Sequence, residues 1–202
     1  MIGILDYGVG NVNAFLNIYK GLGIKAEAIR DASSLHLASH LVLPGVGSFD
    51  YAIDKFNTSG LKGRTEDLVI NSGIPLLGVC VGMQMLASRS DEGGLSGLNW
   101  IPGTVEHFRA YNECKLPLPH MGWNDLILES ENKITNGLDH ASFYFLHSFV
   151  YRSEDPCAVL ASANYGSKFE VIINKNNIYG MQCHPEKSHS FGSRFLKNFS
   201  EL

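Results

Sequence analysis

Apolar and polar positions in the first half of the chain follow two alternating patterns. Short apolar runs, typical of buried parallel strands, occupy residues 2–5, 24–29, 41–43 and 74–79. After the first run, apolar side chains recur at steps of three and four, as on one face of a helix: Val12, Phe15, Leu16, Tyr19 and Leu22. Gly21 and Gly23 are expected to end that helix, and residues 48–71 are also compatible with helix. This alternation predicts a parallel sheet covered by helices.

The second half of the chain is richer in strand patterns. We predict strands at residues 143–151, 158–163, 169–174 and 178–183. A tight turn over residues 174–177 would join the last two strands as a hairpin, and residues 191–202 would form a closing helix. Residues 1–202 are expected to form one domain. Its fold class is α/β, with a parallel or mixed central sheet flanked by helices, extended by antiparallel strands, and with chemistry at the carboxyl ends of the parallel strands.

Composition agrees with a globular protein and narrows its partners. Residues of the AVILMFWYC set make up 45% of the 202 residues, which disfavours disordered and coiled-coil classes. A formal net charge of -4 argues against nucleic-acid binding. Residues 74–87 are too short an apolar segment to span a membrane, and no signal-peptide pattern is evident, so we expect a cytoplasmic protein. The cysteines at 80, 114, 157 and 183 lack a zinc pattern, so reduced thiols, no metal and no cofactor are expected.

Cys80 lies at the centre of residues 78–82, Gly-Val-Cys-Val-Gly, which have the spacing of a nucleophile elbow with cysteine as the nucleophile. An apolar run precedes it, and a helix-like stretch follows over residues 83–88. The glycines permit a sharp strand-to-helix turn, and the start of the helix favours the thiolate. A structural cysteine packed in a turn is the alternative. The two glycines and the preceding strand favour the catalytic interpretation.

A general base for this thiol is available near the end of the sequence. His184 and Glu186 stand two positions apart in His-Pro-Glu, after the strand predicted at residues 178–183. In extended backbone, residues two apart face the same side, so Glu186 would hold one ring nitrogen of His184 while the other faces the sulfur. Considered alone, such a histidine is more often structural. Together with Cys80, it makes a Cys-His-Glu triad.

Glycines also follow the apolar run at residues 41–43, in Pro-Gly-Val-Gly-Ser at residues 44–48. If the strands that end here and at Cys80 are neighbours, the amides of Gly47 and Val81 would hold the oxyanion that forms during acyl transfer through sulfur. An ordinary glycine turn explains these residues equally well.

Six motifs extend over nearly the whole chain: Asp-Tyr-Gly-Val-Gly-Asn at 6–11, Pro-Gly-Val-Gly-Ser-Phe at 44–49, Gly-Val-Cys-Val-Gly-Met-Gln at 78–84, Pro-His-Met-Gly-Trp-Asn at 119–124, Tyr-Phe-Leu-His-Ser-Phe at 144–149 and His-Pro-Glu-Lys-Ser at 184–188. Together they resemble the class I glutamine amidotransferases. The elbow and His-Pro-Glu are shared by that whole class. The Gly-Val-Gly loop, His-Met-Gly-Trp-Asn and His-Pro-Glu-Lys-Ser resemble its branch of glutaminase subunits of imidazole glycerol phosphate synthases.

The resemblance implies a reaction and a pocket. Cys80 would attack the carboxamide of L-glutamine, His184 would pass a proton to the departing ammonia, and Glu186 would orient His184. Water would then release glutamate from the thioester. Gly47 and Val81 would form the oxyanion hole. The substrate-binding residues implied are Gly45, Gln84, Glu92, His147, Ser148 and Phe149.

The resemblance also implies a partner. In this branch a (β/α)8-barrel cyclase subunit docks over the cysteine, receives the ammonia, and makes imidazole glycerol phosphate and an aminoimidazole carboxamide ribotide in histidine biosynthesis. Asn11, Trp123 and Lys187 match positions at the interface of that heterodimer.

Departures from the family pattern leave alternatives open. Val81 replaces the usual leucine. Cys183 replaces a usual aromatic residue and raises the question of which sulfur reacts, although strand alternation would turn Cys183 away from His184. Residues 48–51 and 190–194 resemble a paralogous branch whose glutaminase supplies nitrogen for surface-polysaccharide sugars. A free-standing γ-glutamyl hydrolase and a catalytically inactive scaffold that only binds a barrel partner are the other hypotheses.

Overall fold

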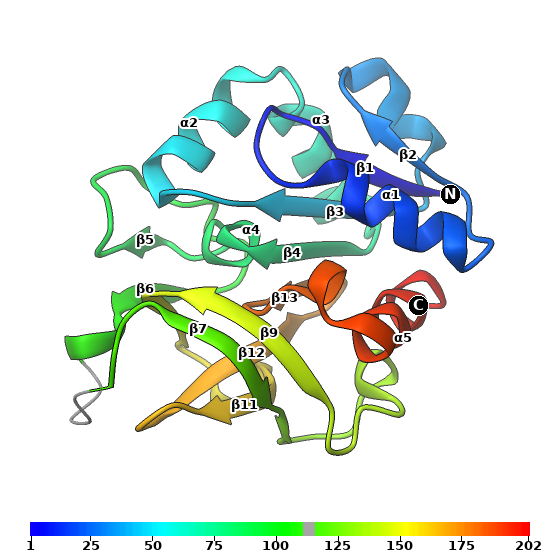
Figure 1. Ribbon diagram of the computed structural model, residues 1–202. Coiled ribbons are helices and arrows are strands. Elements are labelled where there is room, and N and C mark those ends of the chain that lie inside the picture. Colours follow the sequence, from blue (N-terminus) through cyan, green and yellow to red (C-terminus); the bar gives the residue numbers. More distant parts are fainter. Residues whose placement is uncertain (111–115) are drawn as a thin grey trace.

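A computed structural model describes residues 1–110 and 116–202, which are built around one large mixed sheet (Figure 1). The strands of this sheet are β1 (Ile2–Leu5), β2 (Ala26–Ile29), β3 (His40–Gly45), β4 (Leu76–Cys80), β8 (Ile127–Leu128), β11 (Val159–Asn164), β12 (Lys168–Lys175) and β13 (Ile178–Met181). They run in the order β2-β1-β3-β4-β13-β12-β11-β8. Pairing is parallel from β2 to β13 and antiparallel from β13 to β8. The predicted α/β class, a parallel core extended by antiparallel strands, is confirmed.

Two smaller sheets lie beside the large one, mostly next to its antiparallel half (Figure 1). One joins β10 (Phe149–Ser153), β6 (Gly103–His107) and β5 (Arg89–Ser90), and the other joins β7 (His120–Asp125) and β9 (Ser142–His147). The single strand predicted over residues 143–151 is therefore wrong. The chain breaks at Ser148, because β9 pairs with β7 whereas β10 pairs with β6. The apolar character of the segment concealed this change of sheet.

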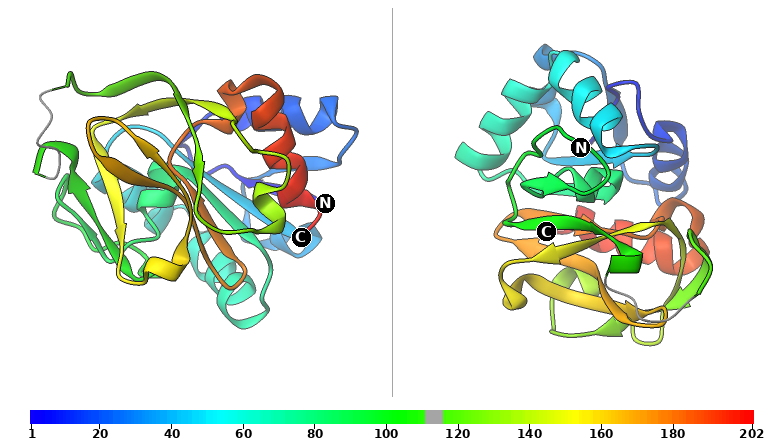
Figure 2. Two further views of the ribbon diagram at one scale, coloured as in Figure 1. Left: turned by 90° about the horizontal axis from the view of Figure 1, so that it is seen from below. Right: turned by 90° about the vertical axis from the view of Figure 1, so that its left-hand side faces the viewer.

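Helices cover both faces of the parallel half, with α1 and α5 on the face opposite α2 and α3 (Figure 2, left). Their bounds are α1 (Val12–Gly21), α2 (Phe49–Thr58), α3 (Lys62–Glu66), α4 (Val81–Gln84) and α5 (His189–Ser200). Further helical segments are η1 (Ala32–Leu37), η2 (Asp67–Asn71), η3 (Phe108–Ala110), η4 (Lys133–Thr135), η5 (Pro156–Ala158) and η6 (Pro185–Lys187). No helix in the described part of the chain is long and apolar enough to cross a membrane.

Two of the expected helices differ from the sequence prediction. The stretch over residues 48–71 is interrupted after α2, where Gly60 takes a left-handed conformation with φ +77°. Glycine adopts this conformation without steric cost, so the chain turns and starts α3 in a new direction. The helix expected over residues 83–88 is instead the short α4, directly after Cys80. The closing helix and the hairpin turn between β12 and β13 are confirmed.

Strand register brings the motif-bearing segments to one edge of the sheet. Gly45, the last residue of β3, pairs with Cys80, the last residue of β4. On the other side of β4, Met181 at the end of β13 pairs with Val79. The chain segments that leave β3, β4 and β13 therefore meet at the carboxyl edge of the parallel strands, where ligands bind in open α/β sheets.

Close packing explains the glycines around the elbow. A Cβ atom on Gly82 would lie 2.0 Å from the carbonyl oxygen of Leu43 in β3, and one on Gly78 would lie 2.6 Å from the carbonyl oxygen of Gly82. A Cβ atom on Gly45 would lie 2.3 Å from the amide nitrogen of Gly82. Because these neighbours are backbone atoms, they cannot move aside as a flexible side chain would. The glycine spacing thus allows α4 to begin in direct contact with β3.

This packing predicts that Gly82→Ala strongly destabilises the protein. The added methyl group would push α4 away from β3, and we expect the free energy of unfolding to fall by about 2–4 kcal/mol. Urea unfolding followed by circular dichroism measures this change. Gly63→Ala in α3 is the matched control, because nothing lies within 4 Å of its Cβ position. Equal stability of the Gly82→Ala variant and the wild type would contradict the packing argument.

Candidate active site

Cys80 has the strained backbone of a nucleophile elbow. Its φ of 55° and ψ of -114° lie outside the regions that non-glycine residues ordinarily adopt. This conformation ends β4, starts α4 and presents the thiol to a cavity of about 300 Å³. The strand before Cys80 is fully buried, so the sheet holds the turn in place.

The imidazole of His184 and the carboxylate of Glu186 are in contact. Nδ1 of His184 lies 2.7 Å from Oε1 of Glu186, and both side chains are almost completely buried. The predicted contact is present, but the predicted extended backbone is wrong. Residues Pro185–Lys187 form the single helical turn η6, and that turn folds Glu186 back onto the ring. The backbone amide of His184 donates to the carbonyl of Tyr144 at 2.9 Å, which anchors the turn to β9.

The surroundings of His184 favour its protonated form. Burial alone would lower the pKa of this imidazole, but hydrogen bonds and charges from Cys80 and Glu186 outweigh the burial and raise it to about 10. The ring nitrogen that does not contact Glu186 is the one available to Cys80. A protonated imidazole beside a thiol stabilises the thiolate, so the arrangement supplies an activated sulfur nucleophile.

The other thiols are in different environments. Cys183 is completely buried, and burial raises the pKa of its thiol well above the usual value. It does not line the cavity that contains Cys80. Cys157 is exposed, away from the cavity, and Cys114 lies outside the described residues. The arrangement therefore favours Cys80 as the reactive sulfur.

Most of the residues that the sequence assigned to one pocket do meet there. The cavity is lined by Gly47, Cys80, Val81, Gln84, Glu92, His147, Ser148, Phe149, His184 and Lys187. Val46, Pro119 and Leu146 also line it and were not predicted. Gly45 does not line the cavity. It packs against the elbow, because a Cβ atom at this position would lie 2.3 Å from the amide nitrogen of Gly82. Its role as a substrate-binding residue is therefore not supported by position.

Two of the polar lining residues are held in place by backbone groups. Oε2 of Glu92 accepts a hydrogen bond of 2.8 Å from the amide of Phe49 at the start of α2. Nε2 of Gln84 donates to the carbonyl of Phe149 at 3.3 Å. These contacts fix a carboxylate and an amide on the cavity wall, where they can bind the charged end of an amino acid.

A chain of neutral imidazoles supports the Phe149 side of the cavity. Nδ1 of His147 lies 2.9 Å from the carbonyl oxygen of Phe149, and Nε2 lies 2.9 Å from Nδ1 of His120. Burial lowers the pKa of His147 to about 3 and that of His120 to about 4. Both rings are thus neutral at pH 7. Since a carbonyl only accepts, Nδ1 of His147 carries the hydrogen, and Nε2 of His147 accepts from His120.

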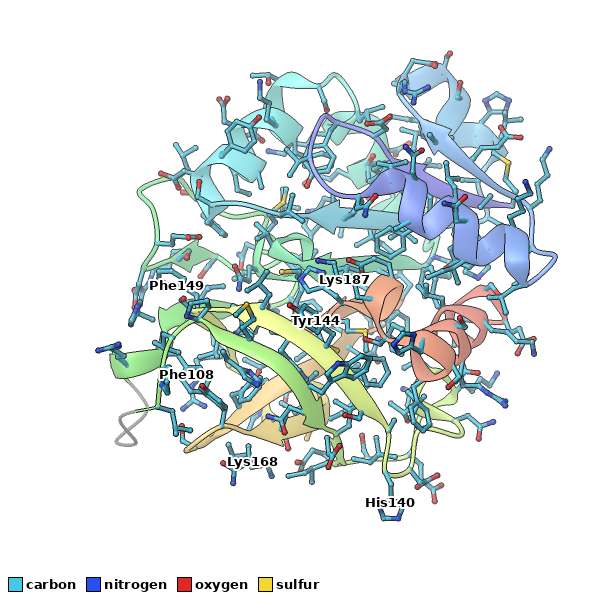
Figure 3. All side chains as sticks on the ribbon, viewed as in Figure 1. Phe108, His140, Tyr144, Phe149, Lys168 and Lys187 are labelled. Atoms are coloured by element: carbon cyan, nitrogen blue, oxygen red, sulfur yellow. The ribbon has the colours of Figure 1, made fainter. Side chains whose placement is uncertain are left out.

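The residues expected at a partner interface lie around this cavity. Lys187 lines the cavity and extends over the ring of Tyr144, with Nζ 5.5 Å from the ring centroid (Figure 3). Trp123 is 51% exposed and stacks on His189 at 5.2 Å. Asn11 caps α1, and α1 and β9 both contact η6, which contains Lys187.

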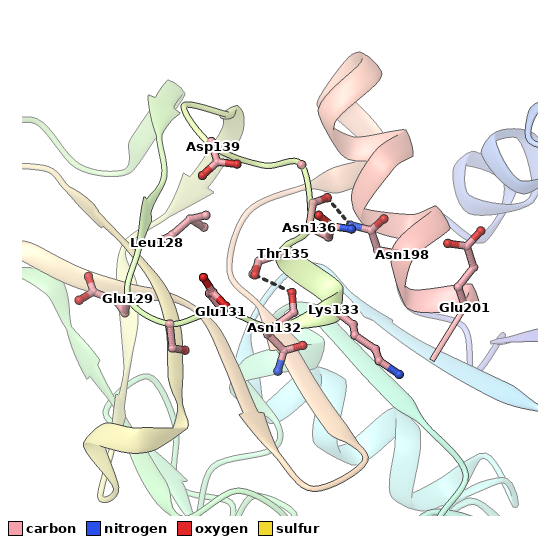
Figure 4. Close-up of a pocket in the computed structure, with 12 residues that line it drawn as sticks. Leu128, Glu129, Glu131, Asn132, Lys133, Thr135, Asn136, Asp139, Asn198 and Glu201 are labelled. Carbon is pink, nitrogen blue, oxygen red and sulfur yellow. Dashed lines mark hydrogen bonds between the residues drawn. The ribbon is translucent and has the colours of Figure 1, made fainter.

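A wider hollow of about 1080 Å³ lies elsewhere, between β8, η4 and α5 (Figure 4). Its polar side chains include Glu129, Glu131, Asp139 and Glu201. The described residues that line it include no cysteine or histidine. Among the residues that the structure describes, no group of three or more His, Cys, Asp or Glu side chains is placed to hold a metal ion.

Two residues near the site were missed from the sequence. Tyr7 donates from its hydroxyl to the carbonyl of Pro44 at 2.6 Å, which anchors the start of the Gly-Val-Gly loop. Gln182 is buried beside Cys80, with Nε2 4.0 Å from Sγ. Tyr7 belongs to the motif at residues 6–11, but the motif itself does not indicate this contact. Gln182 precedes His184 by two positions, a spacing that can place both side chains on the same side of extended backbone.

The fold and this site together define a glutamine amidotransferase. The family model described as "Glutamine amidotransferase class-I" matches residues 4–201, and the chain belongs to this family.

Its similarity to particular proteins extends over the full length. The chain is 50% identical over 204 residues to the "Imidazole glycerol phosphate synthase subunit HisH" of Bdellovibrio bacteriovorus, with 100% of both chains covered. It is 47% identical over 204 residues to the protein of the same description from Leptospira borgpetersenii, again with 100% of both covered. A solved structure described as "Crystal structure of glutamine amidotransferase" matches with a TM-score of 0.75 and 22% identity, covering 99% of this chain and 97% of that chain. This last likeness shows the fold.

The raised pKa of His184 makes stability depend on pH. A histidine whose folded pKa exceeds its unfolded value of 6.5 stabilises the fold fully below that pH, and this contribution is lost as the pH rises through about 10. Glu186→Gln removes the carboxylate that helps raise this pKa. The free energy of unfolding should decrease between about pH 6.5 and about pH 10.5 in both proteins. In the variant this decrease should be smaller than in the wild type by roughly 1–3 kcal/mol. Urea unfolding at both pH values measures the difference.

Glu66→Gln is the matched control, because Glu66 is an exposed carboxylate in α3. Its pH dependence should follow that of the wild type. If Glu186→Gln and the wild type show the same dependence, the carboxylate does not stabilise a protonated His184.

Proposed function

We propose that this chain is the glutaminase subunit of an imidazole glycerol phosphate synthase. It hydrolyses L-glutamine to glutamate and ammonia, and a (β/α)8-barrel cyclase partner uses the ammonia to make imidazole glycerol phosphate and an aminoimidazole carboxamide ribotide. The amidotransferase domain comprises residues 1–202. The observation that carries the proposal is the contact of buried His184 with Glu186 beside Cys80, at a cavity that fits an amino acid.

The reaction proceeds in two steps through sulfur. The thiolate of Cys80 attacks the carboxamide carbon, and the backbone amides of Gly47 and Val81 hold the oxyanion. Protonated His184 gives its proton to the amide nitrogen, the C–N bond breaks and ammonia leaves. Water then loses a proton to His184 and attacks the thioester. The C–S bond breaks, glutamate leaves, and the electron pair returns to the sulfur of Cys80. Glu186 orients His184 throughout.

The cavity wall recognises the amino-acid end of glutamine. Glu92 supplies the negative charge for the substrate ammonium group, and its anchor on Phe49 keeps that carboxylate in place. Gln84 offers its amide from α4, one helical turn after Cys80. The backbone of His147, Ser148 and Phe149 completes the opposite wall, at the point where β9 ends and β10 begins.

A partner docks over the cavity mouth. Exposed apolar side chains gather on the elements that line or flank the cavity: Val46, Met121, Trp123 and Leu146. An exposed apolar surface that includes a tryptophan is typical of a protein interface. Asn11 and Lys187 add polar contacts at its edge. This surface favours a subunit with an obligate partner over a free-standing γ-glutamyl hydrolase.

Full-length similarity favours the histidine pathway over the surface-sugar pathway. The relatives that are 50% and 47% identical are both described as subunits of imidazole glycerol phosphate synthase. Cys80, Cys157 and Cys183 are free thiols. A sulfur nucleophile must stay reduced, and the cytoplasm is a reducing compartment. We therefore expect the complex to work in the cytoplasm.

The proposal predicts that a glutamine-like electrophile labels Cys80. Peptide mass spectrometry of the treated protein should show one adduct, on the peptide that contains Cys80, and L-glutamine should protect that peptide. Cys183 should remain unlabelled because it is buried and protonated. An adduct on Cys183 without one on Cys80 would contradict the assignment.

Cys80→Ala supplies the activity control. In complex with the cyclase partner, the variant should lose glutamine-dependent ammonia transfer into the ribulosyl precursor by at least about 10³-fold. Supplied ammonium salts should still support the cyclase, since the partner uses ammonia directly. Unchanged glutamine-dependent activity in Cys80→Ala would favour the inactive-scaffold hypothesis instead.

A further inference from the structure

Gln182 is a buried polar residue at the active site, between the end of β13 and His184. Its side chain is completely inaccessible to solvent. Its backbone amide donates to the carbonyl of Val171 in β12 at 2.8 Å, so the main chain is fixed to the sheet. A buried side-chain amide is costly unless its polar atoms find partners. The partners that Gln182 finds are both functional: Cys80 and Gln84.

The orientation of the Gln182 amide is determined by its neighbours. Nε2 of Gln84 donates to the carbonyl of Phe149, which can only accept, so the amino group of Gln84 faces that way. The same amino group lies 3.0 Å from Oε1 of Gln182. Oε1 of Gln182 therefore faces Gln84, and Nε2 faces the sulfur of Cys80 at 4.0 Å. Reversal of the Gln182 amide would place two amino groups against each other.

The Phe149 carbonyl fixes the orientation of the Gln84 amide. It accepts from His147 at 2.9 Å as well as from Gln84. Because a carbonyl oxygen has no hydrogen to donate, it must face the amino group of Gln84 and not the oxygen of that side chain. The sulfur of Cys80 thus faces an N–H donor from Gln182.

We propose that Gln182 is a further catalytic residue, whose side-chain N–H donates to the Cys80 thiolate while its oxygen holds Gln84 at the substrate. The inference rests on the proposed glutaminase function. In the pair with protonated His184 the sulfur is negative, and a thiolate binds this N–H more tightly than a neutral thiol would, because charge-assisted hydrogen bonds are shorter and stronger. In the second step, when the C–S bond breaks, the same donor stabilises the sulfur as it leaves with the electron pair.

One side chain thereby serves both ends of the substrate. Its amino group acts on the nucleophile, and its oxygen fixes the amide that faces the amino-acid end. Loss of Gln182 should consequently weaken thiolate formation and glutamine binding together. A merely structural residue would affect neither in a folded protein.

The test measures thiolate formation without turnover or a partner. Iodoacetamide alkylation of Cys80 is followed by peptide mass spectrometry at about pH 6.5 and about pH 9.5, in the wild type and in Gln182→Met. In the variant, we expect the rate at the lower pH to fall about tenfold and the rate at the higher pH to stay within about twofold. The L-glutamine concentration that half-protects Cys80 should rise about tenfold, because Gln84 loses its partner.

Two further variants keep the result interpretable. Asn198→Leu removes another buried side-chain amide, one that donates to the carbonyls of Ile134 and Asn136 and lines the separate hollow beside α5. It should leave both readouts unchanged. Gln182→Asn retains an amide but withdraws it by one methylene, so it cannot reach both partners. It should shift both readouts in the same direction as Gln182→Met, and it serves if the methionine variant fails to fold.

Wild-type alkylation ratios and protection in folded Gln182→Met or Gln182→Asn would overturn the inference. That result would leave the glutaminase proposal intact, provided that wild-type Cys80 is labelled and protected by glutamine. If wild-type Cys80 is neither labelled nor protected, the proposed function fails first, and this inference fails with it.

Discussion

Parallel pairing of β4 with β13 brings Cys80 and His184 together, although they are far apart in the chain. Met181 lies opposite Val79, so each strand delivers its catalytic residue to the same edge a few positions later. The other neighbour of β4 is β3, whose last residue pairs directly with Cys80. Nucleophile, base and oxyanion loop thus come from three adjacent strand ends. A shift of β13 by one residue would turn His184 away from the sulfur.

Burial shifts the pKa values of these groups, and the hydrogen bonds and charges around each group decide the direction of the shift. Cys183 is completely buried, and burial raises the pKa of its thiol well above the usual value. His184 is buried with a carboxylate and a thiol, and these partners raise its pKa to about 10 despite the burial. His147 and His120 contact each other and remain neutral. The same imidazole group is therefore protonated beside Cys80 and Glu186 and neutral in the pair of His147 and His120.

The sequence predicts the parts of this fold that depend on local pattern. The apolar runs at residues 41–43 and 74–79 identify β3 and β4, because buried parallel strands are continuously apolar. Pattern fails where tertiary packing decides, as at Ser148, where an unbroken apolar segment changes sheets. The contact of His184 with Glu186 was predicted from spacing, but the turn that makes it is helical. Gln182 precedes His184 by two positions, but its contacts with Cys80 and Gln84 depend on tertiary packing, which sequence spacing alone does not show.

The charge on His184 tests the active-site assignment most directly. Nuclear magnetic resonance of protein with isotopically labelled histidine reports the protonation of each ring. The pairing of His184 with Glu186 and the sulfur predicts that this ring is protonated at pH 8 and titrates with a pKa of about 10. Cys80→Ala should lower that pKa, since it removes one of the groups that raise it. A wild-type His184 that is neutral at pH 8 would contradict the proposed thiolate–imidazolium pair.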